Sequence, residues 1–173
     1  MRNHMISKFI TGRVYVFIDV ANVFFTRRTL GWGVGYEKLI AYLRRECGAS
    51  VKCFAYTAFD DNKVSERKFL DMLEINGYVA RTKAIKEINV GGGRSKRKGS
   101  LDIELALEMV ELADHYGTVI LVSGDSDFAP ALERVRKKGK RVLVMSTRGH
   151  ISRELLEVAK FIDLRKVRSE IAR

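Results

Sequence analysis

The stretch Thr118-Val-Ile-Leu-Val-Ser-Gly-Asp-Ser-Asp-Phe128 combines the pattern of a buried strand with two carboxylates at its end. Residues 119–122 form an apolar run that is too short and too uniform for an amphipathic helix, so they predict a strand. Helical spacing resumes at Phe128, which places Asp125 and Asp127 in the turn between strand and helix. In open α/β sheets, ligands bind outside the carboxyl ends of the strands. The two acids therefore lie at the position of the ligand-binding site in such a fold.

These acids also have a structural interpretation. Aspartate is a favoured helix N-cap, and Pro130 is tolerated in a first helical turn, so Asp127 is interpreted as either a cap or a ligand. Asp125 is harder to explain as a cap. A second carboxylate beside the first adds repulsion unless a cation or a proton relieves it.

A second apolar run with the same design is Val14-Tyr-Val-Phe-Ile-Asp-Val-Ala-Asn22, which ends in Asp19 and reaches Asn22 three residues later. If the two runs form neighbouring parallel strands, Asp19 lies beside Asp125. The alternative is that Asp19 merely caps the segment beginning at Val20.

The rest of the chain alternates between strand-like and helical patterns. Further strands are predicted at 50–59, 78–85, 141–145 and 161–164, and helices at 36–47, 61–76, 101–116, 128–138 and 152–159. This alternation implies βαβ units, and hence an α/β fold with a mainly parallel sheet.

Composition limits the class of protein. The 173 residues, 46% of them hydrophobic, fit one globular domain with a sizeable core. A net charge of +11 indicates a polyanionic partner, with nucleic acid first and an anionic membrane surface second. Cys47 and Cys53 lack metal-site spacing and are expected to be reduced thiols in or near the core. Because no signal peptide or run of about 18 apolar residues is present, we expect a soluble, cytoplasmic protein.

The domain is expected to span residues 13–165. Residues 1–12 are predicted to be a frayed or loosely docked lead-in. Residues 166–173 form a basic, amphipathic tail that could dock, fray or touch nucleic acid. Trp32 lies in a glycine-spaced loop and either stacks on a base or folds onto the core. A homo-oligomer is compatible with the sequence, which does not determine the oligomeric state.

The segment 86–100 is predicted to be a surface loop, because three glycines precede four basic residues: Arg94, Lys96, Arg97 and Lys98. Contacts from Lys and Arg to phosphates hold a nucleic-acid backbone, and we assign that role to these four. The order Lys98-Gly99-Ser100 excludes a P-loop. The alternative is a solvated, charged loop without a ligand.

Asp102 follows this basic segment. On a helix over 101–116, apolar positions surround Asp102, whereas Glu104 and Glu108 fall on the opposite, polar arc. An acid within an apolar arc costs free energy unless it is paired or metal-bound. The alternative is a first-turn acid that interacts with the helix dipole.

Four carboxylates, Asp19, Asp102, Asp125 and Asp127, are thus expected in one basin, with Asn22 close by. They would repel one another strongly unless divalent cations bound there, and Mg²⁺ or Mn²⁺ prefers such oxygen ligands. A site of this kind can hydrolyse a phosphodiester. The three histidines are scattered and form no HExxH motif, so a zinc hydrolase is not indicated.

Several motifs resemble those of the NYN domain, in the LabA-like (DUF88) branch of the PIN-like nuclease superfamily. They are Phe17-Ile-Asp-Val-Ala-Asn22, Lys98-Gly-Ser-Leu-Asp102 and Ser123-Gly-Asp-Ser-Asp-Phe128, followed by Gly139-Lys-Arg-Val142, Ser152-Arg-Glu-Leu-Leu156 and Phe161-Ile-Asp-Leu164. The resemblance covers about residues 13–165. It implies a Rossmann-like (PIN-like) three-layer fold with a mainly parallel sheet of about five to six strands.

The resemblance also implies metal-dependent ribonuclease chemistry. By position, Asp19, Asp102, Asp125 and Asp127 match the family's acidic metal ligands, Asn22 matches its companion polar residue, and Lys98 matches a basic residue before the helix acid. Many relatives carry another Asp where this chain has Glu108, which we leave out of the metal site because it falls on the polar arc. Some members bind RNA or protein without cutting.

We therefore expect an Mg²⁺- or Mn²⁺-dependent endoribonuclease that acts on single-stranded or loop RNA. The alternatives are a non-catalytic nucleic-acid-binding module and, from a different class, a small-molecule phosphohydrolase.

Overall fold

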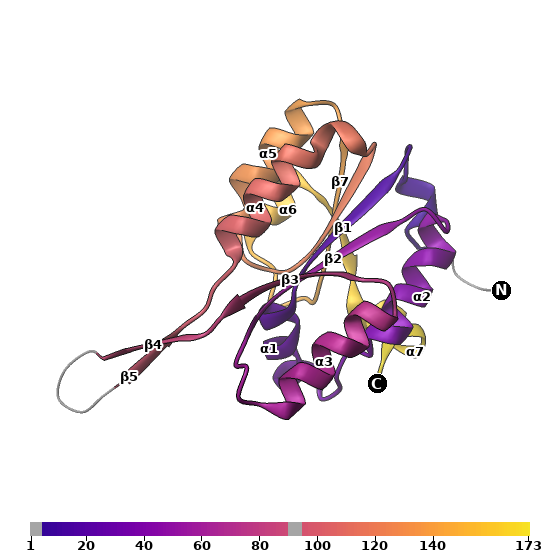
Figure 1. The fold of residues 1–173 in the computed structure, drawn as a ribbon. Helices are drawn as coiled ribbons and strands as arrows, with labels where there is room; N and C mark the ends of the chain where they lie inside the picture. The colour runs from indigo at the N-terminus through magenta and orange to yellow at the C-terminus, as the bar shows by residue number, and fades with distance from the viewer. Residues whose placement is uncertain (1–4, 90–94) are drawn as a thin grey trace.

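The computed structural model describes residues 5–89 and 95–173, and its centre is a sheet of six parallel strands in the order β3-β2-β1-β6-β7-β8 (Figure 1). The strands are β1 (Val14–Asp19), β2 (Lys52–Phe59), β3 (Val79–Ala84), β6 (Thr118–Val122), β7 (Arg141–Ser146) and β8 (Lys160–Asp163). The α/β class and the parallel sheet are confirmed.

Helices cover both faces of the sheet and give three layers (Figure 1). One face carries α1 (Val20–Leu30), α2 (Tyr36–Cys47), α3 (Val64–Ile75) and the short α7 (Arg168–Ile171). The other carries α4 (Asp102–Glu111), α5 (Ala129–Lys137) and α6 (Arg153–Val158). Short 3₁₀ turns lie at η1 (Ser7–Phe9), η2 (Leu112–His115), η3 (Ser126–Phe128) and η4 (Leu164–Val167).

Each face of the sheet has its own hydrophobic core. Successive side chains of a strand point to opposite faces, so Val16 and Ile18 of β1 pack under α1 and α2, while Phe17 packs under α4. Phe17 stacks on Phe54 of β2, with ring centroids 5.1 Å apart. Burial on both sides explains the uniformly apolar sequence of the central strands.

The chain reverses its direction of travel across the sheet between β1 and β6. From β1 it proceeds to β2 and β3 at one edge, whereas β6, β7 and β8 build outward to the other edge. In such a sheet, the crevice at the carboxyl ends of the two strands flanking the reversal is the usual ligand site. The two strands that meet there are β1, which ends in Asp19, and β6, which is followed by Asp125 and Asp127.

The segment 86–100 differs from the predicted loop. Lys86–Asn89 (β4) and Ser95–Lys98 (β5) pair as an antiparallel hairpin, which projects away from the rest of the molecule (Figure 1). Hairpin pairing uses backbone hydrogen bonds, and the charged side-chain pattern here does not reveal it. Of the four basic residues assigned to phosphate binding, Arg94 lies outside the described residues, and the backbone of Lys96, Arg97 and Lys98 forms β5.

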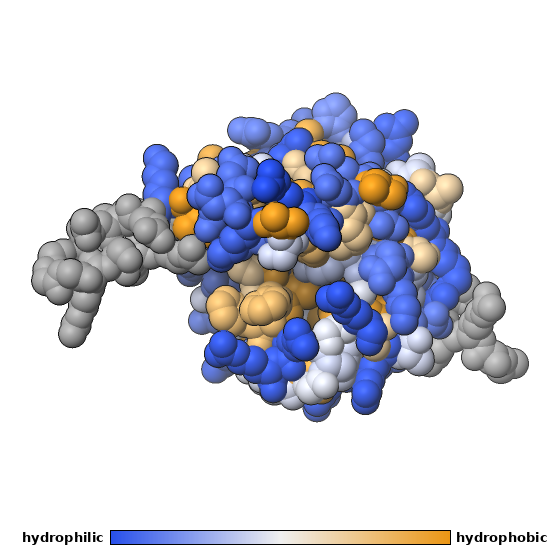
Figure 2. All heavy atoms as spheres, turned by 60° about the horizontal axis from the view of Figure 1, so that its bottom comes forward, coloured by the Kyte–Doolittle hydropathy of each residue, from blue (hydrophilic) through white to orange (hydrophobic). Residues whose placement is uncertain are grey.

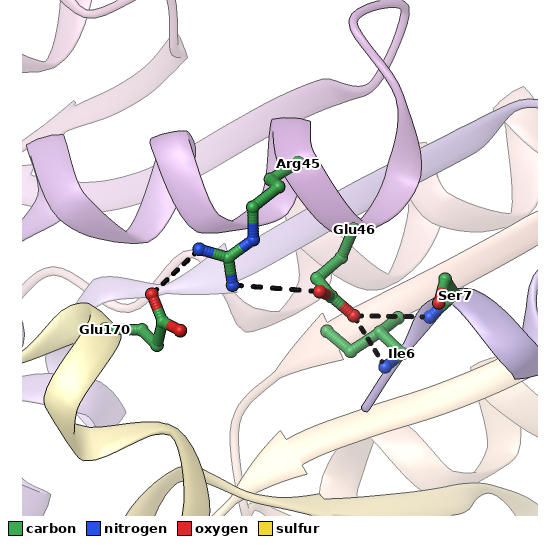
Figure 3. A network of polar contacts seen from close by, with 5 residues as sticks. All are labelled: Ile6, Ser7, Arg45, Glu46 and Glu170. Atoms are coloured by element: carbon green, nitrogen blue, oxygen red, sulfur yellow. Dashed lines mark hydrogen bonds and ion pairs between the residues drawn. The ribbon is translucent and has the colours of Figure 1, made fainter. Parts of the chain in front are cut away.

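The two terminal segments dock on α2. In the lead-in, Ile6 is fully buried, and its backbone N–H donates to Oε2 of the buried Glu46 at 3.0 Å. Arg45 donates to Glu170 of α7 at 2.8 Å and lies 3.7 Å from Glu46 (Figure 3). At the tail, Arg173 donates its backbone N–H to Gly33 at 2.8 Å. Of the options left open for the tail, docking is the one observed.

Truncating Glu46 tests this anchoring. In Glu46→Ala the buried N–H of Ile6 loses its acceptor, and an unpaired buried donor costs about 1–3 kcal/mol. We expect the free energy of unfolding, measured by urea denaturation, to fall by about that amount. The matched control is Glu74→Ala at an exposed position of α3, expected within about 0.5 kcal/mol of wild type. A Glu46→Ala protein as stable as the control would contradict the anchoring role.

Other expectations are settled by burial. Trp32 is 9% exposed and belongs to the core, so it is not a base-stacking residue. Cys53 is buried, Cys47 is half-buried, and both are free thiols whose pKa is raised to about 12 by burial. Among the described residues, no helix is long and apolar enough to cross a membrane.

Candidate functional site

The centre of the candidate site is Asp19, the last residue of β1. Ile18 pairs with Val122 of β6 in the parallel register, so the segments that follow the two strands leave the sheet side by side. The Ser123 hydroxyl donates to Asp19 Oδ2 at 3.1 Å. The other oxygen, Oδ1, accepts the backbone N–H of Asn22 at 3.1 Å. Asp19 therefore does cap α1, as the structural interpretation proposed. Its carboxylate is 8% exposed and is held rigidly at the crevice.

Asn22 joins the two sides of the crevice. Its side-chain Oδ1 accepts the backbone N–H of Gly124 at 3.0 Å. The first turn of α1 is thereby tied to the loop that follows β6, and Asn22 lies next to Asp19 as the sequence predicted. Its observed contact is structural, because it sets the distance between the strand ends.

The two acids after β6 lie in different environments. Asp125 is half-buried, and its Oδ1 accepts the backbone N–H of Asp127 at 3.0 Å, which makes Asp125 the cap of η3. Asp127 is exposed in the first turn. The sequence left Asp127 as either a cap or a ligand and made Asp125 harder to explain as a cap, whereas Asp125 is the cap observed. The 3₁₀ turn η3 begins at Ser126, two residues before the helical spacing begins in the sequence. Asp125 therefore stands at the cap position and accepts the Asp127 backbone N–H.

Asp102 is the first residue of α4 and approaches the crevice from the other face of the sheet. The Ser100 hydroxyl donates to its Oδ2 at 2.6 Å, and the Asp102 backbone N–H donates to the same Ser100 oxygen at 3.2 Å. Its side chain is half-buried rather than enclosed by the apolar arc, because the helix begins at this position and the polar turn before it remains open to solvent.

The charges of two other predicted acids act on Asp19. Burial raises the pKa of Asp19 above its usual value, and the negative charges of Asp102 and Asp125 raise it further, against hydrogen bonds from Asn22 and Ser123 that lower it. Asp102 and Asp125 thus act on Asp19 through their charge. Asp127 is exposed in the first turn of η3.

The sequence pattern of the NYN domain matches residues 13–165, nearly the whole chain. The chain belongs to the NYN domain family. NYN domains are PIN-like nuclease domains, so membership supports a nuclease-like, nucleic-acid-related protein at the level of the family.

Named relatives agree with this assignment. The low amplitude and bright protein LabA of Synechococcus elongatus is 34% identical over 164 residues, covering 92% of this NYN protein and 88% of its own length. The uncharacterized protein MJ0482 of Methanocaldococcus jannaschii is 28% identical over 90 residues, covering 51% of this chain and 38% of its own length. A crystal structure of VPA0982 from Vibrio parahaemolyticus, a protein of unknown function, has a TM-score of 0.77 at 25% identity and covers 94% and 96% of the two chains.

Glu108 occupies the position at which many NYN relatives carry another aspartate. Here it accepts the Tyr56 hydroxyl at 2.6 Å and a bidentate pair of bonds from Arg81, from Nε at 2.9 Å and Nη2 at 2.5 Å. The bond from Arg81 is the main cause of its lowered pKa. The Glu108 carboxylate is engaged in joining α4 to β2 and β3, which agrees with leaving it out of the metal site.

Oxygen ligands for a hard cation are present in this NYN site. Mg²⁺ is usually held by one or two carboxylates and keeps several waters. The buried carboxylate of Asp19 is acted on by the negative charges of Asp102 and Asp125, and a bound cation would relieve this repulsion. Within residues 5–89 and 95–173, no three acid, histidine or cysteine side chains converge on a single point.

Sequence analysis missed two contributors. Ser123 was given no role of its own from the sequence, yet its hydroxyl also accepts the Asp125 backbone N–H at 3.3 Å and so links two acids. Gly124 was seen as part of a motif. A Cβ there would overlap the His150 carbonyl and come within 2.8 Å of Ser146 Oγ. The register of two parallel strands, each ending in an acid, is the signal that predicts Ser123.

Proposed function

We propose that this NYN protein is an Mg²⁺- or Mn²⁺-dependent endoribonuclease whose cation is bound at Asp19 and by water, in an acidic crevice to which Asp102, Asp125 and Asp127 contribute negative charge. The observation that carries the proposal is the buried carboxylate of Asp19, placed at the topological reversal of the sheet and raised in pKa by burial and by two neighbouring acids. Perturbed acids in a crevice are typical of functional sites. Family membership supports nucleic acid as the substrate class.

In this proposal, the acidic and the basic side chains have separate roles. When bound, a divalent cation activates a water and stabilises charge on the phosphate oxygens. Hydrogen bonds from Asn22 and Ser123 fix the Asp19 side chain, so its carboxylate is already oriented when a cation binds. The excess of 32 basic over 21 acidic residues attracts a polyanion to an otherwise acidic crevice. The basic residues of the hairpin remain our proposed phosphate contacts.

The second candidate is an RNA-binding module that does not cut. One observation favours this candidate. Among the described residues, the acids do not form a complete set of metal ligands. Such a protein would retain the charge-driven affinity for RNA while lacking hydrolysis.

Cleavage of a labelled, structured RNA with Mn²⁺, Mg²⁺ or EDTA tests the proposal. We expect wild type to cut in either metal and not in EDTA. A variant with Asp19→Asn plus Asp125→Asn, purified in parallel, should bind RNA and not cut. The single Asp127→Asn variant should retain more activity than Asp125→Asn, because Asp125 is half-buried and its charge acts on Asp19, whereas Asp127 is exposed.

Three outcomes decide between the candidates. Cutting that persists equally in the double variant would identify a contaminant and reject the proposed site. RNA binding by wild type without cutting in any metal would favour the binding module. Metal-dependent cutting that disappears in the folded double variant would establish the carboxylates as the active site.

A further inference from the structure

Helix α1, which begins at the site, carries a pair of aromatic rings outside the core. Phe24 is 61% and Phe25 is 55% exposed, and their ring centroids lie 5.9 Å apart at an interplanar angle of 75°. The same helix buries Val23 and the smaller, polar Thr26. Burying a phenylalanine side chain stabilises a fold by roughly 1.5–3 kcal/mol. Two exposed rings beside a buried threonine therefore do not contribute this stability, which indicates a role other than folding.

Positive charge surrounds the rings. Arg27 and Arg28 follow them in sequence and are exposed, and the Arg28 guanidinium lies 5.9 Å from the centroid of the Phe25 ring. A shallow hollow of about 360 Å³ is lined by Phe24, Arg27, Arg28 and Gly31. Figure 2 shows the lower side of Figure 1, on which α1 lies, with hydrophobic side chains beside a hollow and hydrophilic ones around them.

The rings are close to the acids. Phe24 is five residues after Asp19 on a continuous helix, and a rise of 1.5 Å per residue places it about 8 Å along the helix axis. The hollow and the crevice therefore both involve α1, at different points along its axis and on different sides of the helix, since five residues also turn it by about 140°. A single extended polymer can contact both without a change in the fold.

We propose that Phe24 and Phe25, with Arg27 and Arg28, form a stacking platform for unpaired bases of a single-stranded nucleic acid that also reaches the acids at Asp19. The choice of ligand rests on the proposed function. Aromatic side chains stack on bases of any sequence, and arginines beside them contact the phosphates. In a duplex, neighbouring bases cover both faces of each base, so the rings select single strands.

Charge favours nucleic acid over a second copy of this chain. Each copy carries a net charge of +11, and two copies joined through this face would bring their arginine pairs together. Like charges in contact are unfavourable, whereas a polyanion complements them. The platform therefore fits a phosphate-bearing strand.

Affinity measured in EDTA tests the platform without cleavage. Fluorescence anisotropy would compare a labelled 12-nucleotide single-stranded RNA, the matching DNA strand and a blunt RNA duplex. In Phe24→Leu plus Phe25→Leu, apolar bulk remains but the ring faces are lost. Stacking of about 1–3 kcal/mol per base predicts a loss of single-strand affinity of at least about tenfold. Duplex affinity should not change.

Matched variants complete the comparison. Phe24→Tyr plus Phe25→Tyr keeps the ring faces and should bind single strands as wild type does. Ile75→Ala, which shortens an 84% exposed apolar side chain on α3, should also match wild type. Loss of affinity of the leucine variant for the RNA or the DNA single strand supports the platform. The single strand that wild type binds more tightly identifies the ligand as RNA or DNA.

Two results would overturn the inference. One is single-strand affinity that is unchanged in the leucine variant, or lost equally for the duplex. The other is a wild-type dimer, seen by sedimentation, that dissociates in Phe24→Ser plus Phe25→Ser, since a second copy would then cover the rings. Either result leaves the cleavage test of the carboxylates intact. Conversely, ring-dependent binding by a protein that never cuts would reject the nuclease and retain the platform.

Discussion

Asp19→Asn is expected to reduce metal-dependent cleavage by about a hundredfold or more while making the protein more stable at pH 8. The loss of activity follows from the proposed role, since a bound metal supplies several kcal/mol of transition-state stabilisation. The gain in stability follows from burial. The Asn side chain fits the same space, keeps an acceptor for Asn22, and removes a buried charge that lies near Asp102 and Asp125.

The sign of the stability change depends on pH. The folded state raises the pKa of Asp19 above the reference value of 3.8, so folding favours the protonated form. That contribution is fully present below pH 3.8 and is lost as pH rises through the raised pKa. Wild type therefore carries the cost of an ionised Asp19 at pH 8, and the variant does not. The difference should shrink as pH falls toward 3.8.

Thermal unfolding in EDTA measures this effect. For a protein of this size, each kcal/mol corresponds to roughly 2–4 °C in Tm, and we expect the variant to melt higher than wild type at pH 8. Added Mn²⁺ should raise the Tm of wild type more than that of the variant. A variant that melts lower at pH 8 without metal would show that the Asp19 hydrogen bonds outweigh the repulsion, contrary to our account.

Gly124→Ala is expected to be the most destabilising of the substitutions considered. The added Cβ would overlap the backbone carbonyl of His150 and crowd Ser146 Oγ, and backbone atoms cannot rotate away as a flexible side chain can. The Gly124 carbonyl also accepts the Ser152 N–H at 3.0 Å, so relief requires the whole loop to move. We expect a loss of about 3 kcal/mol or more in the free energy of unfolding.

Gly33→Ala is the matched control. A Cβ at Gly33 would meet only the flexible side chain of Arg27 at 3.7 Å, so its stability should lie within about 1 kcal/mol of wild type. Urea denaturation of both variants checks the prediction. If Gly124→Ala were as stable as Gly33→Ala, the close approach of the 147–152 loop to the acidic motif would be wrong.

Much of the fold is readable from periodicity. Short β-branched runs such as residues 119–122 become central strands because both faces of a parallel sheet are covered, and apolar spacing over 36–47 reproduces the bounds of α2. Other boundaries shift by a few residues, because turns begin where a backbone N–H finds a cap. The hairpin β4–β5 escaped prediction, since its pairing leaves no apolar pattern in a basic, glycine-rich segment.

The candidate site was partly readable. Two strands that end in acids predict that Asp19 and the loop after Val122 meet, and the register confirms this adjacency. The sequence does not show that Asp125, rather than Asp127, caps the following turn, nor that Ser100 holds Asp102. These contacts depend on loop geometry that lies outside any repeating pattern. The catalytic role of the acids stays a prediction for the cleavage experiment.

By itself, the sequence predicted the parallel α/β architecture, because apolar periodicity and the alternation of strands with helices are visible along the chain. Its motifs predicted the family by resemblance. Only the tertiary structure decided which side chains are covered. Trp32 enters the core while Phe24 and Phe25 remain exposed beside a buried Thr26, because burial depends on the neighbouring element that packs against a residue, and the hydrophobicity of the residue does not specify that neighbour.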